Sequence, residues 1–541
     1  MSSELIKRAV FNLDKSNQLD LLDTLDIETN NQQRQNGSEF KQRPVIFNDP
    51  DPKEIYLGGI RLDKHIKLTG DRSAFLVREM MEQHEWTLFE RSYHREGRRA
   101  YAPRCMLGLI LYGVMHGVSS LRGLERLARL DLGCMWVSGG ILPDHSIIGR
   151  FIQQHEVLLS EASFDALTRQ VLQATGSNNE SLAGDGTVVE AAASRYKLLK
   201  IEAALQAAED ARKASEVKPD DMKLAERALF AEEVKCKLEQ RQATREKKGK
   251  NAAGLQISPS EPDAVIQPLK DKKIFAASYK PSVLANKERI IVAQAVDASS
   301  ETRVVAAMLD KAGQLGQIKE VLFDAGYHSN DVIEATQTRG IELLCPEGRS
   351  KGKDWNKQSS KYYPKSQFEY NQARDNYRCP AGEVLVKVSQ YKGNAEYSGY
   401  IEYGTSACGG CPQKNQCTKR ETGRRIKRYA GDQAKDALRS KMKEPESRKR
   451  YVQRQAMVEP VFSVLKLCQG LRRFRRRGLR GVQTEFALHA MAYNLSRAVA
   501  MGIFIVYIRI FRLKIIEQYK SYLLKNHYFY AYKRALHEYT L

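Results

Sequence analysis

The sequence predicts an α+β fold, in which a mixed sheet flanked by helices follows an all-helical N-terminal domain and is interrupted by two insertions. Between residues 65 and 172, apolar residues recur three and four positions apart, which is typical of helices packed on a core. Between residues 274 and 346, short apolar runs alternate with helical segments, which is typical of a sheet with crossover helices. The insertions differ in composition from their surroundings and occupy 195–250 and 347–440.

The chain is strongly basic. Of its 541 residues, 87 are Lys or Arg and 65 are Asp or Glu, which gives a formal charge of +22. Such a balance predicts a polyanionic partner, either a nucleic acid or an anionic membrane surface. The apolar run AVAMGIFIVYI at 498–508 is too short to span a membrane, because a spanning helix needs about 20 apolar residues. We therefore expect a nucleic acid as the partner, and no membrane.

Two further features concern the cellular compartment. The first 40 residues are polar and mixed in charge, and they lack the apolar stretch of a signal peptide. The nine cysteines then predict a reducing compartment, where clustered cysteines more often bind metal than form disulfides. We expect a cytoplasmic protein.

The first 172 residues fall into two parts. Residues 1–64 form a polar segment that is rich in Asn and Gln at its start, and we expect it to be partly disordered. Residues 65–172 predict several short helices joined by tight turns. On a basic chain, this pattern favours a helix-turn-helix-like DNA-binding domain. A helical bundle that only packs against its neighbours is the alternative.

An acidic residue ends a predicted strand after this domain. In SLAGDGTVVEAAAS (181–194), small residues lead to Asp185, and Gly186 follows it. A turn residue is the alternative for Asp185. Residues 195–250 are rich in Ala, Glu, Lys, Arg and Leu, and they predict a helical hairpin or arm with a break at 217–221.

A second acidic residue, Asp324, ends another predicted strand. A loop at 251–272 is followed by the order strand, strand, helix, strand, helix, strand. Together with the strand at Asp185, this is the order of a ribonuclease-H-like sheet, which we place within 173–346. Ligands of open α/β sheets bind beyond the strand ends, where both aspartates fall. A helix cap is the alternative for Asp324. The predicted strands in this part are 274–285, 289–299, 320–324 and 341–346.

Residues 347–440 form a basic, loop-rich segment with clustered cysteines. A CxxC pair with two further cysteines fits a structural zinc site with four thiolates. Cys345 could replace one of these ligands, and unliganded structural cysteines are the alternative. The four candidate zinc ligands are Cys379, Cys408, Cys411 and Cys417.

A third acidic residue, Glu459, lies on a helix predicted within 441–500. Helical spacing places it on one face with Gln455 and Lys466. We expect Lys466 and the arginines that follow it to contact DNA phosphates, and a solvated basic helix is the alternative. These arginines are Arg472, Arg473, Arg475, Arg476, Arg477 and Arg480. Three other acids of this region are weaker candidates for the role of Glu459: Glu444, Glu446 and Glu485.

Three stretches together carry the pattern of a known family. They are LAGDGTVVEAAAS, VLFDAGYHS, and VEPVFSVLK with its RF…RG…YNL continuation. In this order they resemble the DDE transposases encoded by bacterial insertion sequences, in the group whose last acidic residue sits in a Tyr-Arg-Glu-Lys signature. The resemblance covers most of the chain between residues 70 and 500. The tyrosine-rich tail at 501–541 looks appended, and its residues indicate no function.

The resemblance implies a catalytic and metal-binding triad that would hold Mg²⁺ or Mn²⁺, namely Asp185, Asp324 and Glu459. Glu459 and Lys466 keep the six intervening residues of the family signature. Tyr451 and Arg454 are present as well, but Arg454 lies one residue further from Glu459 than the signature asks.

A function follows from the resemblance. Such an enzyme cuts DNA at the ends of its own mobile element and joins them to target DNA, by chemistry that uses two metal ions. The resemblance implies a homodimer on two paired DNA ends, close to the bacterial nucleoid, with the N-terminal helices reading the inverted repeats. A ribonuclease-H-like nuclease without strand transfer is one alternative. A catalytically silent DNA-binding regulator, or a transposase relic, is the other.

Overall fold

The computed structural model describes residues 45–502 apart from short gaps at 95–96, 248, 250, 253, 270–273, 349–361 and 395–397. The chain divides into two compact units, one of Met1–Phe47 with Ser92–Ala100 and the other of all remaining residues. The elements below belong to the second unit. Partial disorder was predicted for residues 1–64 and an appended tail for 501–541. Of these segments, residues 1–44 and 503–541 lie outside the described residues.

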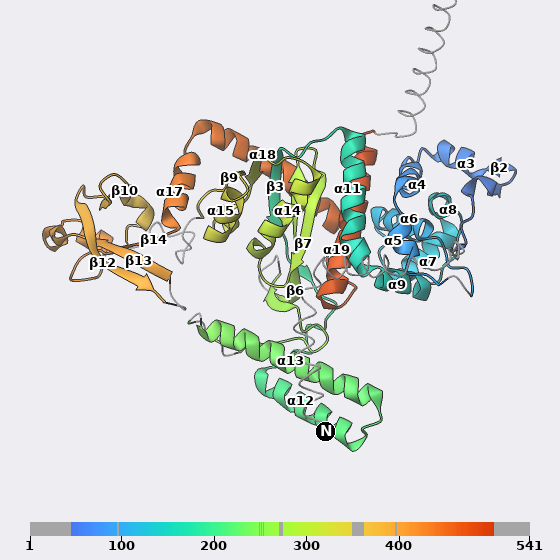
Figure 1. Cartoon of the computed structure of the whole chain (residues 1–541), viewed down its shortest axis with the longest axis horizontal. Helices are drawn as coiled ribbons and strands as arrows, with labels where there is room; N and C mark the ends of the chain where they lie inside the picture. Colours follow the sequence, from blue (N-terminus) through green and yellow to red (C-terminus); the bar gives the residue numbers. More distant parts are fainter. Residues whose placement is uncertain are drawn as a thin grey trace, which may run out of the picture. The chain divides into compact units, whose positions relative to one another are not determined.

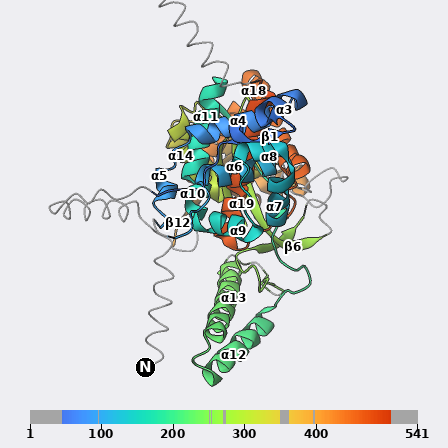
Figure 2. The same cartoon turned by 90° about the vertical axis from the view of Figure 1, so that its right-hand side faces the viewer.

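Short helices make up the N-terminal part of this unit, as predicted (Figures 1 and 2). After a small hairpin of β1 (Tyr56–Leu57) and β2 (Ile60–Arg61) come α3 (Leu62–Thr69), α4 (Ser73–Gln83), α5 (Thr87–Glu90), α6 (Pro103–Met115), α7 (Leu121–Leu130), α8 (Leu132–Ser138), α9 (His145–Gln154), α10 (Glu156–Ser160) and α11 (Ala162–Thr175). Helix α6 is central, because every residue from Cys105 to Val114 is buried. The side chains of Ser120, Asp131 and Asp144 cap the first turns of α7, α8 and α9.

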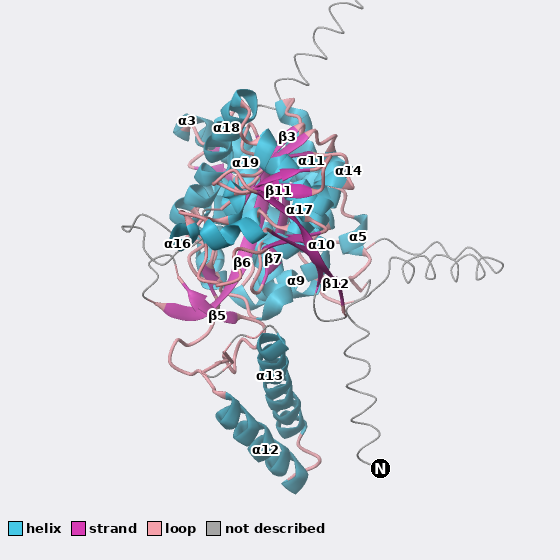
Figure 3. Ribbon diagram, turned by 90° about the vertical axis from the view of Figure 1, so that its left-hand side faces the viewer, coloured by secondary structure: helices cyan, strands magenta, loops and turns pink. Residues whose placement is uncertain are grey.

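A mixed sheet of seven strands follows (Figure 3). Its strands are β3 (Ser181–Gly186), β4 (Val189–Glu190), β5 (Val265–Pro268), β6 (Phe275–Asn286), β7 (Ile291–Asp297), β8 (Glu320–Leu322) and β9 (Glu342–Leu344). Five of them lie in the order β7-β6-β3-β8-β9. Strand β6 is antiparallel to β7 and β3, whereas β8 is parallel to β3 and β9. The predicted α+β class is therefore confirmed.

The remaining two strands lie beside the first part of β6. Both β4 and β5 pair with it antiparallel, at Ser278 and its neighbours. The prediction of a loop over 251–272 was therefore wrong for Val265–Pro268. This short stretch becomes a strand only because β6 is available to pair with it, which a local pattern does not show.

Helices cover the sheet. They are α14 (Val305–Leu315) between β7 and β8, α15 (Asn330–Gln337) between β8 and β9, α18 (Pro445–Ser463) and α19 (Gly478–Ala500). Helix α18 packs on β3 and β6, whereas α19 packs on β7 and also on α6, α10 and α11. Helix α19 therefore ties the N-terminal helices to the sheet. Within the described ranges, no helix is both long enough and apolar enough to cross a membrane.

Two antiparallel helices form an arm between β4 and β5. They are α12 (Ile201–Val217) and α13 (Met222–Lys247), and Figures 1 and 2 show them side by side. The predicted break at 217–221 is confirmed. Ala204, Val234 and Leu238 are buried between the helices and the segment at Ile257. The outer faces carry helical ion pairs such as Arg212 with Glu216, as expected from the charge pattern.

The cysteine-containing segment folds around a second sheet, so its description as loop-rich was wrong. We name residues 362–431 the cysteine module. Its antiparallel strands pair in chain order: β10 (Glu369–Asn371), β11 (Asn376–Arg378), β12 (Val384–Gly393), β13 (Ser398–Gly404) and β14 (Ile426–Tyr429). Phe368, Tyr377, Leu385, Tyr403 and Ile426 form its small core. Helix α16 (Lys414–Cys417) lies within the module, and α17 (Asp432–Lys441) follows it.

One arginine of α18 links two strands of the main sheet. Arg450 Nη1 donates to Glu320 at 2.6 Å, and its guanidinium also holds Glu342 at 2.7 Å. The hydrogen bond from Arg450, with Lys441 nearby, lowers the pKa of Glu342 to about 2. The ion pair therefore stabilises the fold at pH values above the ordinary Glu pKa. Its contribution to the free energy of unfolding is lost as the pH falls towards 2.

We expect Arg450→Met to lower the free energy of unfolding by about 1 kcal/mol at pH 7, because the pair is partly exposed to solvent. Urea titration at pH 7 and again near pH 3 measures the effect, and the difference between variant and wild type should shrink at the lower pH. Lys449→Met removes an exposed cation from the same helix and is the matched control. Equal losses in the two variants would contradict a specific role for Arg450.

Candidate functional site

The first predicted acid, Asp185, sits at the carboxyl end of β3. The small residues before it have a packing reason: a Cβ at position 184 would lie 2.0 Å from Phe323 Cε1, so Gly184 lets this ring cover the strand. The Asp185 carboxylate accepts a hydrogen bond from the N–H of Gly186 at 2.9 Å. Its side chain is 23% exposed, which leaves it reachable from solvent at the sheet edge.

The second acid lies beside the first. Asp324 comes two residues after β8, which is parallel to β3 and hydrogen-bonded to it, so both side chains leave the sheet at the same edge. Asp324 also acts as the predicted cap, because its Oδ1 accepts from the N–H of Gly326 at 2.9 Å. Burial raises the pKa of Asp185 to about 6, Arg454 opposes this, and the nearby charges of Asp324 and Glu301 add to it. The two aspartates therefore share one electrostatic environment.

Helix α18 brings two further signature residues to this pair. Arg454 Nη2 lies 3.4 Å from Asp185 Oδ1 and 3.5 Å from the Gly184 carbonyl oxygen. Its buried Nε has no hydrogen-bond partner in the described part of the chain. Tyr451, one turn earlier, is half-buried. Burial is the main cause of its raised pKa, and the charges of Asp324 and Asp185 make smaller contributions in the same direction. The extra residue between Arg454 and Glu459 thus does not remove Arg454 from the site.

The third acid, Glu459, has a hydrogen-bond partner within its own helix. Glu459 is exposed on α18 and accepts from Gln455 Nε2 at 3.0 Å. Buried residues Val458 and Val461 hold this part of the helix against the sheet. Among the residues that the structure describes, no group of three His, Cys, Asp or Glu side chains is arranged to hold a metal ion.

Glu459 nevertheless lies on the part of α18 that runs along the acidic edge. Arg454 precedes it and contacts Asp185, while Lys466 follows it and contacts the hydroxyl of Thr187. Thr187 is two residues beyond Asp185 in the chain. Both ends of the Glu459 segment are thereby fixed to the end of β3.

A further carboxylate near Asp185 was not predicted. A Cβ added to Gly186 would lie 2.6 Å from Glu301 Cγ, so this glycine makes room for the Glu301 side chain. Glu301 also pairs with Lys280 at 3.5 Å. The sequence offered one indirect signal, a glycine directly after Asp185, but nothing in it pointed to a residue more than a hundred positions away.

Of the three rival acids, Glu485 has a structural role. It is buried, and its carboxylate accepts the backbone N–H groups of Arg475 and Arg476 at 2.9 and 2.8 Å. It fixes the start of α19 rather than facing the aspartates. Glu444 and Glu446 stand at the opposite end of α18 from Glu459, at its first turn.

The arginine run lines a groove with the N-terminal helices. The groove encloses about 960 Å³. Its cationic lining comes from α7, from α9 and from the segment before α19, and consists of Arg122, Arg150, Arg475, Arg476 and Arg477. Arg475 Nε reaches across it to Ser119 Oγ at 3.1 Å. Arg122 and Arg150 were not singled out in the sequence, because each lies on an ordinary amphipathic helix and neither belongs to a run of basic residues.

The other predicted phosphate contacts are placed differently. Arg473 donates to the backbone carbonyls of Ala191 and Ala193, so part of its guanidinium is used to hold the chain beside β4. Arg472 and Arg480 are exposed but are not among the residues that line the groove.

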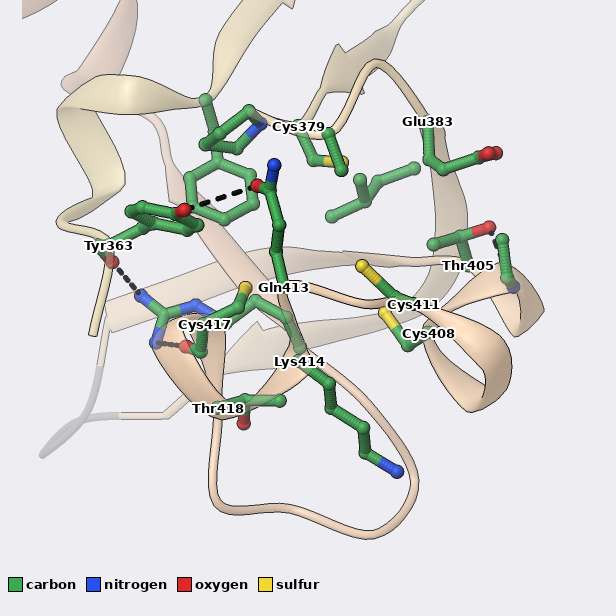
Figure 4. Close-up of a pocket in the computed structure, with 16 residues that line it drawn as sticks. Tyr363, Cys379, Glu383, Thr405, Cys408, Cys411, Gln413, Lys414, Cys417 and Thr418 are labelled. Atoms are coloured by element: carbon green, nitrogen blue, oxygen red, sulfur yellow. Dashed lines mark hydrogen bonds between the residues drawn. The ribbon is translucent and has the colours of Figure 1, made fainter. Parts of the chain in front are cut away.

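The four cysteines of the cysteine module line one small cavity (Figure 4). Cys379 lies in the turn after β11, Cys408 and Cys411 in the loop after β13, and Cys417 at the end of α16. The cavity has a volume of about 20 Å³, close to the size of one small ion or water. Burial raises the pKa of the Cys417 thiol, and the other three thiols contribute in the same direction.

Cys345 is not a substitute ligand. It is buried directly after β9, and its Sγ donates to the carbonyl oxygen of Asp324 at 3.1 Å. It thus supports the acidic edge of the main sheet and does not line the cysteine cavity.

Comparison with known proteins identifies two parts of the chain. Residues 61–154, the N-terminal helices, match a family described as a transposase domain (DUF772). Residues 378–499, from the cysteine module through Glu459 to α19, match a family described as a transposase DDE domain. No curated protein matches the chain. Asp185 and Asp324 lie between the matched segments, so their assignment depends on their geometry.

Proposed function

We propose, from the premise that this chain is a DDE transposase of the insertion-sequence type, that it cuts the ends of its own mobile element and joins them to target DNA. One observation carries the proposal: Asp185 and Asp324 stand at the ends of two adjacent parallel strands, with Arg454 of α18 against them. Hydrolysis would release a 3′-hydroxyl at the element end, and this hydroxyl would then attack a target phosphodiester.

The strand order supports a ribonuclease-H-like core. The chain order that the sequence predicted for this fold is present as β3, β6, β7, α14, β8, α15 and β9. The structure adds the directions: the first three strands pair antiparallel, and β8 and β9 are parallel to β3. The α12–α13 arm leaves this core after β4, and the cysteine module leaves it after β9. We assign these two segments as its insertions.

The acidic residues fit a hard divalent cation. Carboxylate oxygens are the ligands that Mg²⁺ prefers. Burial is the main cause of the raised pKa of Asp185, the charges of Asp324 and Glu301 add to it, and a bound cation would offset both effects. Asp185 and Asp324 would hold it, and Glu459 would join them from α18. When bound, two such ions supply charge neutralisation at the phosphoryl oxygens and an activated water.

The chain's own cations would position the DNA strand at this edge. The buried Nε of Arg454 is a donor without a partner among the described residues, and it would donate to a phosphate placed against the aspartates. Lys466, held at Thr187, would add a second contact beyond Glu459. These contacts fix the reacting phosphodiester in line with the carboxylates, which is how positioning contributes to the rate.

The basic groove is proposed as the DNA-binding surface of the N-terminal domain. It joins Arg475, Arg476 and Arg477 to Arg122 and Arg150 of a helix-turn-helix-like region. Phosphate contacts of this kind give affinity and orientation, while base contacts give sequence preference. A dimer would be required to hold the two element ends together.

We expect Arg122→Ala and Arg150→Ala each to weaken binding of the element ends. Each should reduce the slope of log affinity against log salt concentration by about 1, because each removes one phosphate contact. Fluorescence anisotropy over a range of salt concentrations measures the slope. Arg129→Ala is the matched control on α7, since Arg129 is paired with Glu125 and does not line the groove. An unchanged slope in both groove variants would contradict the assignment.

The cysteine cavity is proposed as a structural zinc site. Zn²⁺ takes four Cys ligands in structural sites, and the four cysteines line one cavity. Their side chains would have to converge on the ion, because no three of them are arranged to hold a metal in the described structure. Cys379, Cys408, Cys411 and Cys417 would be the ligands.

A cleavage and joining assay tests the function. The substrate is a duplex that carries the inverted repeats flanking the gene, with Mg²⁺ or Mn²⁺ present, and a second substrate carries an end that is already cut. Cleavage of the first and joining of the second are the expected results. Cleavage without joining would identify a nuclease, and binding without either reaction would identify a DNA-binding regulator.

A further inference from the structure

A row of three tyrosines crosses the sheet of the cysteine module. Tyr391, Tyr400 and Tyr429 are direct cross-strand neighbours on β12, β13 and β14. Their ring centroids are separated by 5.4 Å between the first two and 5.7 Å between the last two. Alternate residues of a strand point to opposite faces, so the row lies on the face opposite to the buried Tyr403.

This face is open to solvent. Tyr391 is 37% exposed and Tyr429 is 40% exposed, whereas the core residues of the other face, Tyr403 and Ile426, are at 0% and 2%. Val386 of β12 pairs with Gly404 and is 56% exposed on the same side. Aromatic rings left in water on a small sheet offer a stacking surface without a partner in the described chain.

Positive charge accompanies the row. Lys427 Nζ lies 3.9 Å from the centroid of the Tyr400 ring. Lys365 Nζ lies 5.9 Å from the centroid of the Tyr429 ring. Across residues 362–431, twelve Lys and Arg stand against six Asp and Glu, of which Glu402 lies opposite Lys427 on the neighbouring strand.

We propose that this tyrosine row binds the unpaired bases of a DNA strand. Every base has a flat face that stacks on an aromatic ring, whatever the sequence, and nearby cations then meet the phosphates. Base faces are covered by their neighbours in a duplex, so a stacking surface selects strands whose bases are unstacked. The inference rests on the proposed function, which supplies DNA as the polyanion.

A protein partner is the competing occupant of an open aromatic face. The charge pattern favours DNA, because the centres of protein interfaces are depleted in charged residues, whereas here Lys427 lies over the Tyr400 ring and Lys365 over the Tyr429 ring. A nucleic-acid strand uses both features of this surface at once.

The test measures binding of a labelled oligothymidine and of a blunt duplex to the full chain by fluorescence anisotropy. Tyr391→Ala and Tyr429→Ala should each weaken oligothymidine binding by about tenfold, because each removes one stacking partner. Binding of the duplex should not change. Tyr391→Phe should bind as wild type does, since stacking needs the ring and not the hydroxyl. Tyr196→Ala, which removes a tyrosine that is 95% exposed outside the module, is the matched control.

Several outcomes would overturn the inference. The first is that both Ala variants bind oligothymidine as tightly as wild type does. The second is that they lose duplex binding to the same extent, which would indicate a misfolded module or a non-specific cation effect. Failure of Tyr391→Phe to bind would show that stacking is not the interaction. If the tyrosines prove necessary for oligothymidine binding but wild type never cuts element ends, the inference stands and the proposed function fails. If wild type cuts and the tyrosine variants bind normally, only the inference fails.

Discussion

Asp185→Asn is expected to abolish Mg²⁺-dependent cleavage of the element ends while leaving DNA binding intact. Metal ions contribute several kcal/mol at the transition state, so we expect a rate loss of at least about 10³-fold. An amide in place of the carboxylate keeps the size of the side chain but removes the charge that a cation requires. Asp324→Asn and Glu459→Gln should have the same effect, measured in single-turnover cleavage of a labelled duplex.

Asp185→Asn is expected to lose activity but not stability. The folded chain raises the pKa of Asp185 to about 6, above the ordinary value of 3.8, so its charged form is disfavoured by folding. Without metal, this carboxylate therefore lowers stability as the pH rises from about 4 through 6. At pH 7 and without divalent cations, Asp185→Asn should unfold at the same temperature as wild type or at a higher one.

Addition of Mg²⁺ should raise the unfolding temperature of wild type and not that of Asp185→Asn, because only wild type gains a bound ligand. Asp310→Asn is the matched control. It removes an exposed carboxylate that pairs with Arg339, just after α15, and this variant should cleave DNA as wild type does. A lower unfolding temperature for Asp185→Asn would contradict the proposed role, since it would show that the carboxylate serves the fold. Undiminished cleavage by Glu459→Gln would remove Glu459 from the triad.

Loss of zinc is expected to unfold the cysteine module. Its core holds only five buried residues, and small domains of this kind commonly depend on a metal for stability. Structural zinc contributes apparent binding free energies of about 10–16 kcal/mol in zinc-finger peptides at pH 7, which exceeds what such a core supplies. Wild-type chain should contain one equivalent of zinc by elemental analysis, and a chelator should expose the module to limited proteolysis.

Cys411→Ser should lose this zinc and become sensitive to proteolysis within the module without a chelator. The exposed Cys236 of the arm offers the matched control, because Cys236→Ser removes a thiol far from the cavity in sequence and should keep full zinc content. Equal zinc content in Cys411→Ser and wild type would contradict the site. A wild-type chain without zinc that resists proteolysis would favour unliganded structural cysteines.

Much of the main fold follows from patterns local in the sequence. Each of these signals arises from residues close together in the sequence. They are the helical spacing between 65 and 172, the break between α12 and α13, and the strands at Asp185 and Asp324. Strand β5 was missed for the opposite reason. It has only four residues, and pairing with β6 is what makes it a strand.

The cysteine module was described as loops because its strands are short and polar on their exposed side. Strand β12 has ten residues, of which nearly all are exposed or half-exposed, so it lacks the alternation that predicts a half-buried strand. Its partners in the sheet, and not its own composition, fix its conformation. Cysteine spacing, in contrast, was a sufficient signal for the residues that line the cavity.

The candidate residues and their order could be read from the sequence: two aspartates at strand ends, a glutamate on a basic helix and a four-cysteine cluster. Which residues contact one another became known from the packing of the folded chain. It placed Arg454 on Asp185, brought Glu301 over Gly186, and joined Arg122 and Arg150 to the arginine run. It also left Glu459 exposed on α18. Periodicity reports on neighbours along the chain, whereas these contacts join residues far apart in the sequence. They are set by how whole elements pack, which no local pattern encodes.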